Sequence, residues 1–243
     1  MLYERYYQEV TRTLERVFCG QARQLQQTAA LVADAFAADG LVYLFGCGHS
    51  HLITEDVFYR AGGFAPVCPI LDSALMLHDG AVKSSCLERM PGLARPVFDR
   101  FPITQRDVLI VFSTSGINPV PTEMAQCARE KGVPVVAVVS RAYDGDASRH
   151  PAGHKLTDFA DIILDNGVCH GDAAVEVGDS GVRVGPVSTI SACTILQAVM
   201  VQAAELLWER GAELPVYVSG NLPSGMERNA GLIERYRSRI RCL

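Results

Sequence analysis

Two glycine- and serine-rich turns in this sequence each follow a short apolar run, and their residue types suit the binding of an oxyanion. The first turn contains Gly46, Gly48 and Ser50, and the second is the sequence Ser-Thr-Ser-Gly at 113–116. A strand that leads through such a turn into a helix directs backbone N–H groups and hydroxyls at one point, with the positive end of the helix dipole behind it. The two turns together therefore predict a site for the phosphate of a small molecule.

Hydroxyls and one amide are the side chains expected to hold that phosphate, while glycines permit close approach of the backbone. The expected phosphate ligands are Ser50, Ser113, Thr114, Ser115, Asn118 and Ser188, and the expected loop glycines are Gly46, Gly48 and Gly116. Asn118 precedes a proline and also suits the N-cap of a helix, as Ser50 and Ser188 do at their own helix starts. Capping and anion binding therefore both remain open for these three side chains.

Four residues near these turns are candidates for acid–base chemistry. His51 and Glu55 stand four positions apart and share one face of the helix expected after the first turn. His78 and Glu88 lie in the segment 72–92, which is long enough to cover a site. An imidazole and a carboxylate exchange protons readily with a substrate, so these four are the candidate catalytic residues. The alternative for each is a charged group on a solvated surface.

Alternation of apolar and amphipathic segments predicts the elements that position these residues. Strands are expected at 41–45, 66–71, 107–112, 133–140 and 161–164. Two helices are expected within 2–38, and further helices at about 51–61, 85–90, 94–101, 119–131, 188–209 and 227–241, with a β-hairpin at 173–185. Such alternation indicates a parallel sheet with helices on both faces, joined by right-handed crossovers.

The expected topology brings the two turns together. In a five-stranded sheet of order 2-1-3-4-5, the first and third strands are neighbours, and ligands bind in the crevice beyond their carboxyl ends. Both turns follow those two strands. We therefore predict an α/β fold, a three-layer αβα sandwich of flavodoxin-like order. One domain spans 1–243, with N-terminal helices (about 1–39), a small β-hairpin insertion and a C-terminal tail (about 212–243).

Composition argues against several other classes of function. The 243 residues carry a formal net charge of −5 and lack the basic surface of a nucleic-acid-binding protein. No uninterrupted apolar run approaches the ~18 residues of a membrane span, so no membrane partner is expected. The eight cysteines are irregularly spaced without a Cys-x-x-Cys pair, which favours reduced thiols, a cytoplasmic location and no metal site. Proton transfer by side chains needs no cofactor, and none is expected.

The Gly-x-Gly-x-Ser sequence of the first turn and the Ser-x-Ser-Gly sequence of the second resemble the sugar isomerase (SIS) domain family over about residues 20–210. The whole chain is similar to single-domain bacterial members related to phosphoheptose isomerases. The resemblance implies a homodimer or homotetramer with sites near subunit interfaces. It also implies that Ser113, Ser115 and Thr114 hold the phosphate of a sugar, with a contribution from Ser50.

Two departures from the phosphoheptose isomerases affect the catalytic assignment. The glutamate late in the first helix of those enzymes has no counterpart at 57–60, so that base is absent or moved to Glu55. The histidine of their last helix is absent from 190–209. Glu55 and Glu88 instead fall in segments comparable to those that carry glutamates in the related muramic acid 6-phosphate etherases. The resemblance thus implies aldose–ketose isomerisation of a sugar phosphate, with two alternatives: elimination of an ether from an amino-sugar phosphate, or sensing of a phosphosugar without turnover.

Overall fold

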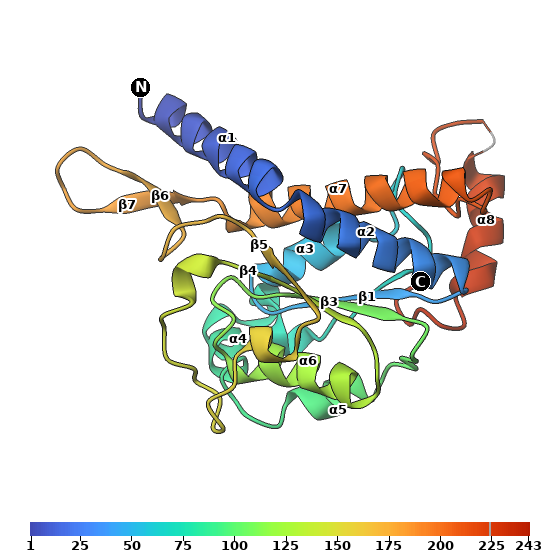
Figure 1. Cartoon of the computed structure of the whole chain (residues 1–243), viewed down its shortest axis with the longest axis horizontal. Helices are drawn as coiled ribbons and strands as arrows, with labels where there is room; N and C mark the ends of the chain where they lie inside the picture. The colour runs from blue at the N-terminus through green and yellow to red at the C-terminus, as the bar shows by residue number, and fades with distance from the viewer. Residues whose placement is uncertain (224) are drawn as a thin grey trace.

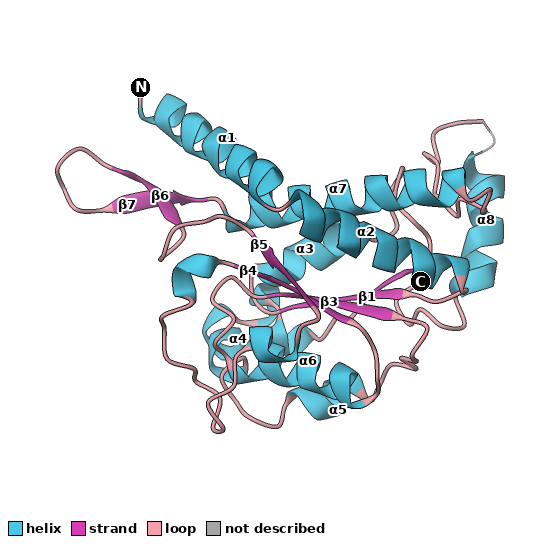
Figure 2. Cartoon of the chain, in the orientation of Figure 1, coloured by secondary structure: helices cyan, strands magenta, loops and turns pink. Residues whose placement is uncertain are grey.

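The computed structural model describes residues 1–223 and 225–243 and confirms the predicted five-stranded sheet. Its strands are β1 (Val42–Gly46), β2 (Val67–Pro69), β3 (Val108–Phe112), β4 (Val135–Val139) and β5 (Ile162–Asp165). Neighbouring strands are parallel, and their order is β2-β1-β3-β4-β5. Figure 2 shows this sheet between helices that cover both of its faces. The three-layer αβα arrangement is therefore the one expected from the sequence.

The central strands are buried along their whole length. The sequences VLIVF of β3 and VVAVV of β4 are uninterrupted apolar runs, and every residue in them is buried, as strands covered on both faces require. Some strands are shorter than expected from sequence. The run at 133–140 begins as a strand only at Val135, because Pro134 has no N–H to donate to a neighbouring strand.

One face of the sheet is covered by α2 (Ala22–Ala37), α3 (Ser50–Asp56) and α7 (Ser188–Glu209), whose buried residues form a single cluster with it, and α1 (Leu2–Gly20) joins that cluster through Val17. α7 is the one helix in 1–223 and 225–243 that is long and apolar enough to cross a membrane by length and composition. Its residues Ile195, Val199 and Ala203 are buried in that cluster beside α2. The apolar character of α7 is thus used in packing.

The other face carries α4 (Ala81–Leu87), α5 (Ala94–Phe98) and α6 (Pro119–Glu130), and α8 (Gly225–Tyr236) joins the same cluster at one end. Short 3-10 turns at Ser73–Leu75, Leu77–Asp79, Arg141–Tyr143 and Leu156–Phe159 complete the chain. α3 ends at Asp56 rather than near 61, because Tyr59 adopts a φ of +48°, which a helix does not allow.

α1 and the hairpin of β6 (Ala173–Glu176) and β7 (Arg183–Pro186) project together from the body of the molecule, at the upper left of Figure 1. The Tyr6 hydroxyl donates to the carbonyl oxygen of Pro186 at 2.8 Å and joins the two elements. Gly185 permits this contact, since a Cβ there would lie 2.6 Å from the Tyr6 ring. We refer to α1 and this hairpin as the arm.

Candidate functional site

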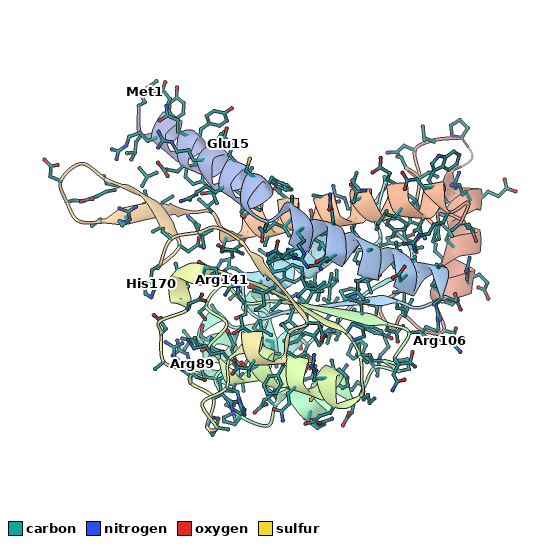
Figure 3. The ribbon with its side chains drawn as sticks, in the orientation of Figure 1. Met1, Glu15, Arg89, Arg106, Arg141 and His170 are labelled. Carbon is teal, nitrogen blue, oxygen red and sulfur yellow. The ribbon has the colours of Figure 1, made fainter. Side chains whose placement is uncertain are left out.

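The two glycine-serine turns lie side by side at the carboxyl ends of β1 and β3, as expected. The strands run in parallel register, with Gly46 opposite Phe112, so the turns begin at neighbouring positions. Figure 3 shows Arg89 and Arg141 toward this end of the sheet and Arg106, which precedes β3, at the other. We call the end that carries the two turns the carboxyl edge.

The glycines in these turns are required by the path of the chain. A Cβ on Gly46 would lie 2.5 Å from the carbonyl oxygen of Ser50, so the first turn of α3 packs directly on the end of β1. Gly48 and Gly116 have φ values of +57° and +65°, a region that favours glycine. The three glycines thus bring the start of α3 and the β3 turn to the carboxyl edge.

The hydroxyls of the two turns fall into two groups. The Ser113 Oγ accepts a hydrogen bond from the Gly116 N–H at 3.3 Å, and the Thr114 Oγ1 accepts one from the Asn166 amide at 3.4 Å. The hydroxyls of Ser50 and Ser115 make no hydrogen bond with the residues that the structure describes. Those last two hydroxyls are therefore the ones most open to a ligand.

Ser188, also expected as a phosphate ligand, is engaged elsewhere. Its hydroxyl and its backbone N–H both donate to the carboxylate of Asp172, and the Val187 N–H donates to the same carboxylate at 3.0 Å. Asp172 therefore satisfies the N–H groups at the start of α7, and Ser188 belongs to that arrangement.

Asn118 occupies the N-cap position of α6, yet its side chain does not cap the helix. Its Nδ2 donates to the Glu88 Oε1 at 2.6 Å, and its Oδ1 accepts from the Arg149 guanidinium at 2.9 Å. Both ends of the amide are thus engaged. The side chain thus bridges two other segments instead of capping α6, and its role as a phosphate ligand stays a prediction.

Glu88 lies between the two turns. Its backbone carbonyl accepts from the Val120 N–H at 3.2 Å, which fixes the end of α4 against the start of α6. Burial raises the pKa of the Glu88 carboxyl, while the hydrogen bond from Asn118 and the charges of Arg89 and Arg149 act against that rise. Burial and then the charge of Glu88 raise the pKa of the Cys47 thiol in the β1 turn. The Glu88 carboxyl therefore lies near Cys47 of the β1 turn as well as Asn118 at the start of α6.

His51 and Glu55 form a second pair on α3. The His51 Nδ1 lies 3.0 Å from the Glu55 Oε1; the imidazole is 2% exposed and the carboxyl 43% exposed. Since a carboxylate only accepts, Nδ1 carries the proton and Nε2 carries a lone pair. That Nε2 is buried and has no hydrogen-bond partner within 1–223 and 225–243. Burial also lowers the pKa of His51, so the neutral imidazole is favoured.

His78 is exposed on the turn Leu77–Asp79, and its charge adds to the lowering of the His51 pKa, so the two imidazoles are near one another. The structure thus gathers Ser50, His51, Glu88, the β3 turn and His78 at one edge. Arg149 is a site residue that the sequence did not reveal. It lies within the polar stretch 141–155, and nothing in its spacing indicates a partner at Asn118.

Other hollows lie away from this edge. A cavity of about 750 Å³ opens at the amino ends of β1 and β3, between Tyr43, Asp107, Lys131 and Arg239. No group of three or more His, Cys, Asp or Glu side chains among the described residues is arranged to hold a metal ion. None of the four candidate catalytic residues lines this cavity.

Residues 5–140 match the model of the SIS domain family, which is more than half of the chain. The protein therefore belongs to the SIS domain family. A UPF0309 protein of Brucella canis is 44% identical to it over 236 residues, which are 97% of this chain and 96% of that protein.

Two solved structures share the fold at low sequence identity. Phosphoheptose isomerase GmhA from Neisseria gonorrhoeae has a TM-score of 0.57 and 17% identity, with 84% of this chain and 100% of that chain covered. The NanR protein of Vibrio vulnificus, complexed with ManNAc-6P, has a TM-score of 0.51 and 17% identity, with 98% and 69% covered. Both likenesses concern the arrangement of the sheet and helices.

Proposed function

We propose that this protein binds a phosphorylated sugar at the carboxyl edge and isomerises it between its aldose and ketose forms. The observation that carries the proposal is the position of Glu88, a partly buried carboxyl that is bonded to Asn118 just after the β3 turn and lies near Cys47 of the β1 turn. A phosphosugar in complex with NanR on a similar fold also supports a ligand of this class.

The phosphate is assigned to the turns. Ser50 and Ser115 offer hydroxyls that no described side chain engages, and Ser113 and Thr114 add further hydroxyl oxygens. Hydrogen bonds to a charged phosphate contribute more than those to a neutral group, so this anchor supplies much of the affinity and sets the orientation of the sugar.

Glu88 is assigned as the base. Its carboxylate removes the proton from C2 of the aldose as the C1 carbonyl takes up electron density, which gives an enediol. Glu88 then returns the proton to C1, and the hydroxyl proton moves from O2 to O1. A carboxylate with a raised pKa is a stronger base than an ordinary one, and burial is the cause of that rise here. His51 is assigned to the proton transfer between O2 and O1 of the sugar, because the lone pair of its Nε2 has no hydrogen-bond partner among the described residues.

Elimination from an amino-sugar phosphate is a second candidate, because it begins with removal of a proton next to a carbonyl or masked carbonyl, and because NanR holds the amino-sugar phosphate ManNAc-6P. Glu88 would be the base in that reaction too. Binding without turnover is the third outcome that the experiment below separates from these two.

The test uses hexose, heptose and amino-sugar phosphates, ManNAc-6P included, with binding measured by calorimetry and turnover by exchange of the C2 hydrogen in D2O. Binding with exchange in the wild type, and binding without exchange in Glu88→Gln, supports isomerisation or elimination, which the products distinguish. Binding that is unchanged by Glu88→Gln and shows no exchange indicates a sensor. If none of these phosphates binds, the proposal is wrong.

A homodimer or homotetramer also belongs to this proposal. The arm leaves large apolar side chains in solvent, among them Tyr3 at 64%, Tyr7 at 70% and Val182 at 57% exposure. A second copy of the chain would cover them. Light scattering of the wild type is expected to give a mass that is a multiple of 26.3 kDa. In the double variant Tyr3→Ser with Tyr7→Ser, the mass is expected to fall toward that of a single chain. A wild-type protein of single-chain mass contradicts this part.

A further inference from the structure

The polar loop 141–155 passes over the carboxyl edge. The Arg149 N–H donates to the carbonyl oxygen of Ile117 at 2.9 Å, and the Leu156 N–H donates to that of Gly116 at 2.9 Å. These backbone contacts fix the loop against the β3 turn. They place the Arg149 side chain where it meets Asn118.

The next residue of the loop, His150, reaches α6. His150 Nε2 lies 3.6 Å from the Glu123 carboxylate on α6, and both side chains are mostly buried. Both oxygens of that carboxylate accept from the Gly92 N–H at 2.9 Å. Consecutive residues of one loop are thus linked to Asn118 and, through Glu123, to the segment that follows Glu88.

We propose that Arg149 is a positioning residue for Glu88, acting through the orientation of the Asn118 amide. An amide side chain has one accepting and one donating end. Because Arg149 only donates, it holds the Oδ1 of Asn118, and this leaves Nδ2 to face the Glu88 carboxylate. With the amide reversed, two accepting oxygens would oppose one another across a 2.6 Å contact.

This arrangement favours the ionised form of Glu88 in a buried place. The charged and titratable groups around the carboxyl are Arg89 on its own segment, Arg149 on the loop and the Cys47 thiol on the β1 turn. Without Arg149 the amide is free to turn and a nearby positive charge is lost. The ionised carboxylate then loses support, and the pKa of Glu88 rises further.

Titration of Glu88 without any substrate tests the role of Arg149. The protein is labelled with 13C at glutamate side chains, and Glu88→Gln assigns the carboxyl signal. Arg149→Ala is expected to raise the pKa of Glu88 by about half a unit or more, and Arg149→Lys, which still donates, to restore most of the wild-type value. Arg141→Ala is the matched control, since Arg141 lies in the same loop but pairs with Asp144.

A double-mutant cycle with Asn118→Ala distinguishes orientation from a direct effect of charge. If Arg149 acts through Asn118, then Arg149→Ala adds little to the shift already caused by Asn118→Ala. A shift of the same size in both backgrounds, or no shift in Arg149→Ala at all, overturns the proposal. Thermal unfolding of each variant shows that the fold is retained.

The inference rests on the proposed function only for the statement that Glu88 reacts with substrate. If no sugar phosphate turns over while Arg149→Ala still shifts the titration of Glu88, the proposed function fails and the positioning role stands. Where turnover is found, the lower limb of the pH profile of kcat should move upward in Arg149→Ala by the same amount as the titration, with a smaller change in KM.

Discussion

The two halves of the carboxyl edge hold their acid–base groups in different ways. On the β1 side, Glu55 is 43% exposed and holds a buried imidazole through its Nδ1. On the β3 side, the group that is held is itself a carboxyl, the partly buried Glu88, and the exposed Arg149 holds it through the Asn118 amide. In each half an exposed charged residue orients a buried polar group.

This difference indicates which of the two carboxyls, Glu55 or Glu88, is better suited to exchange a proton with a carbon atom of the substrate. Glu55 faces water and has its partner in His51, whereas Glu88 is desolvated, and burial raises its pKa. A carboxyl in the second environment accepts a proton more readily at neutral pH. The sequence offered both glutamates on equal terms, and burial separates them.

Glu88→Gln should have the largest effect of any single change at this edge. The amide keeps the shape and can still accept from Asn118, but it cannot take a proton, so turnover is expected to fall by about 10²–10⁴-fold. Glu55→Gln is the comparison, with a loss of about tenfold, because Glu55 acts only through His51. Equal losses in steady-state kcat would remove the distinction between the two halves.

His51→Gln is expected to lower turnover by about 10²-fold, since it removes the buried Nε2 while keeping a polar side chain. The double variant with Glu55→Gln should be no slower than His51→Gln alone, because Glu55 then has no imidazole to orient. A further tenfold loss in the double variant would indicate that Glu55 acts directly on the substrate.

Ser115→Ala together with Ser50→Ala should weaken binding of a sugar phosphate by about tenfold or more and leave binding of the unphosphorylated sugar nearly unchanged. Both hydroxyls are unengaged within the described residues, so the change leaves no buried partner unsatisfied. Ser188→Ala, whose hydroxyl is held by Asp172, is the matched control. Equal losses for both kinds of sugar would place the phosphate elsewhere.

The sequence predicted the fold and the meeting of the two turns well, because both follow from local signals. β3 and β4 are continuous apolar runs, as strands buried on both faces are, and the order of elements sets which strands are neighbours. The bounds were less accurate in 72–106, where α4 begins at Ala81 rather than near 85, since short helices between turns have weak periodicity.

The sequence could not predict the hydrogen-bond partners of the polar side chains. Asn118 suited either a cap or a ligand by its position, yet it bridges Glu88 and Arg149, which lie 30 and 31 residues away. Ser188 is held by Asp172 in the same way. A short polar side chain can bond to any group that tertiary structure brings near it, so its choice depends on loop paths that no local pattern determines.

The smallest expected effect is on stability, and it concerns the ionisation of Glu88 alone. Burial raises the pKa of this carboxyl in the folded chain, so the folded state binds the proton more tightly than the unfolded state. The stability that Glu88 contributes is therefore fully present below the unfolded pKa and is lost as the pH rises through the folded pKa.

Glu88→Gln has no such loss. From about pH 4 toward neutrality, the variant should thus gain stability relative to the wild type, by urea unfolding at a series of pH values. Arg141→Ala should follow the wild-type profile. A difference between Glu88→Gln and wild type that stays constant with pH would show that Glu88 is no more desolvated than Glu55, and the contrast between the two halves of the edge would disappear.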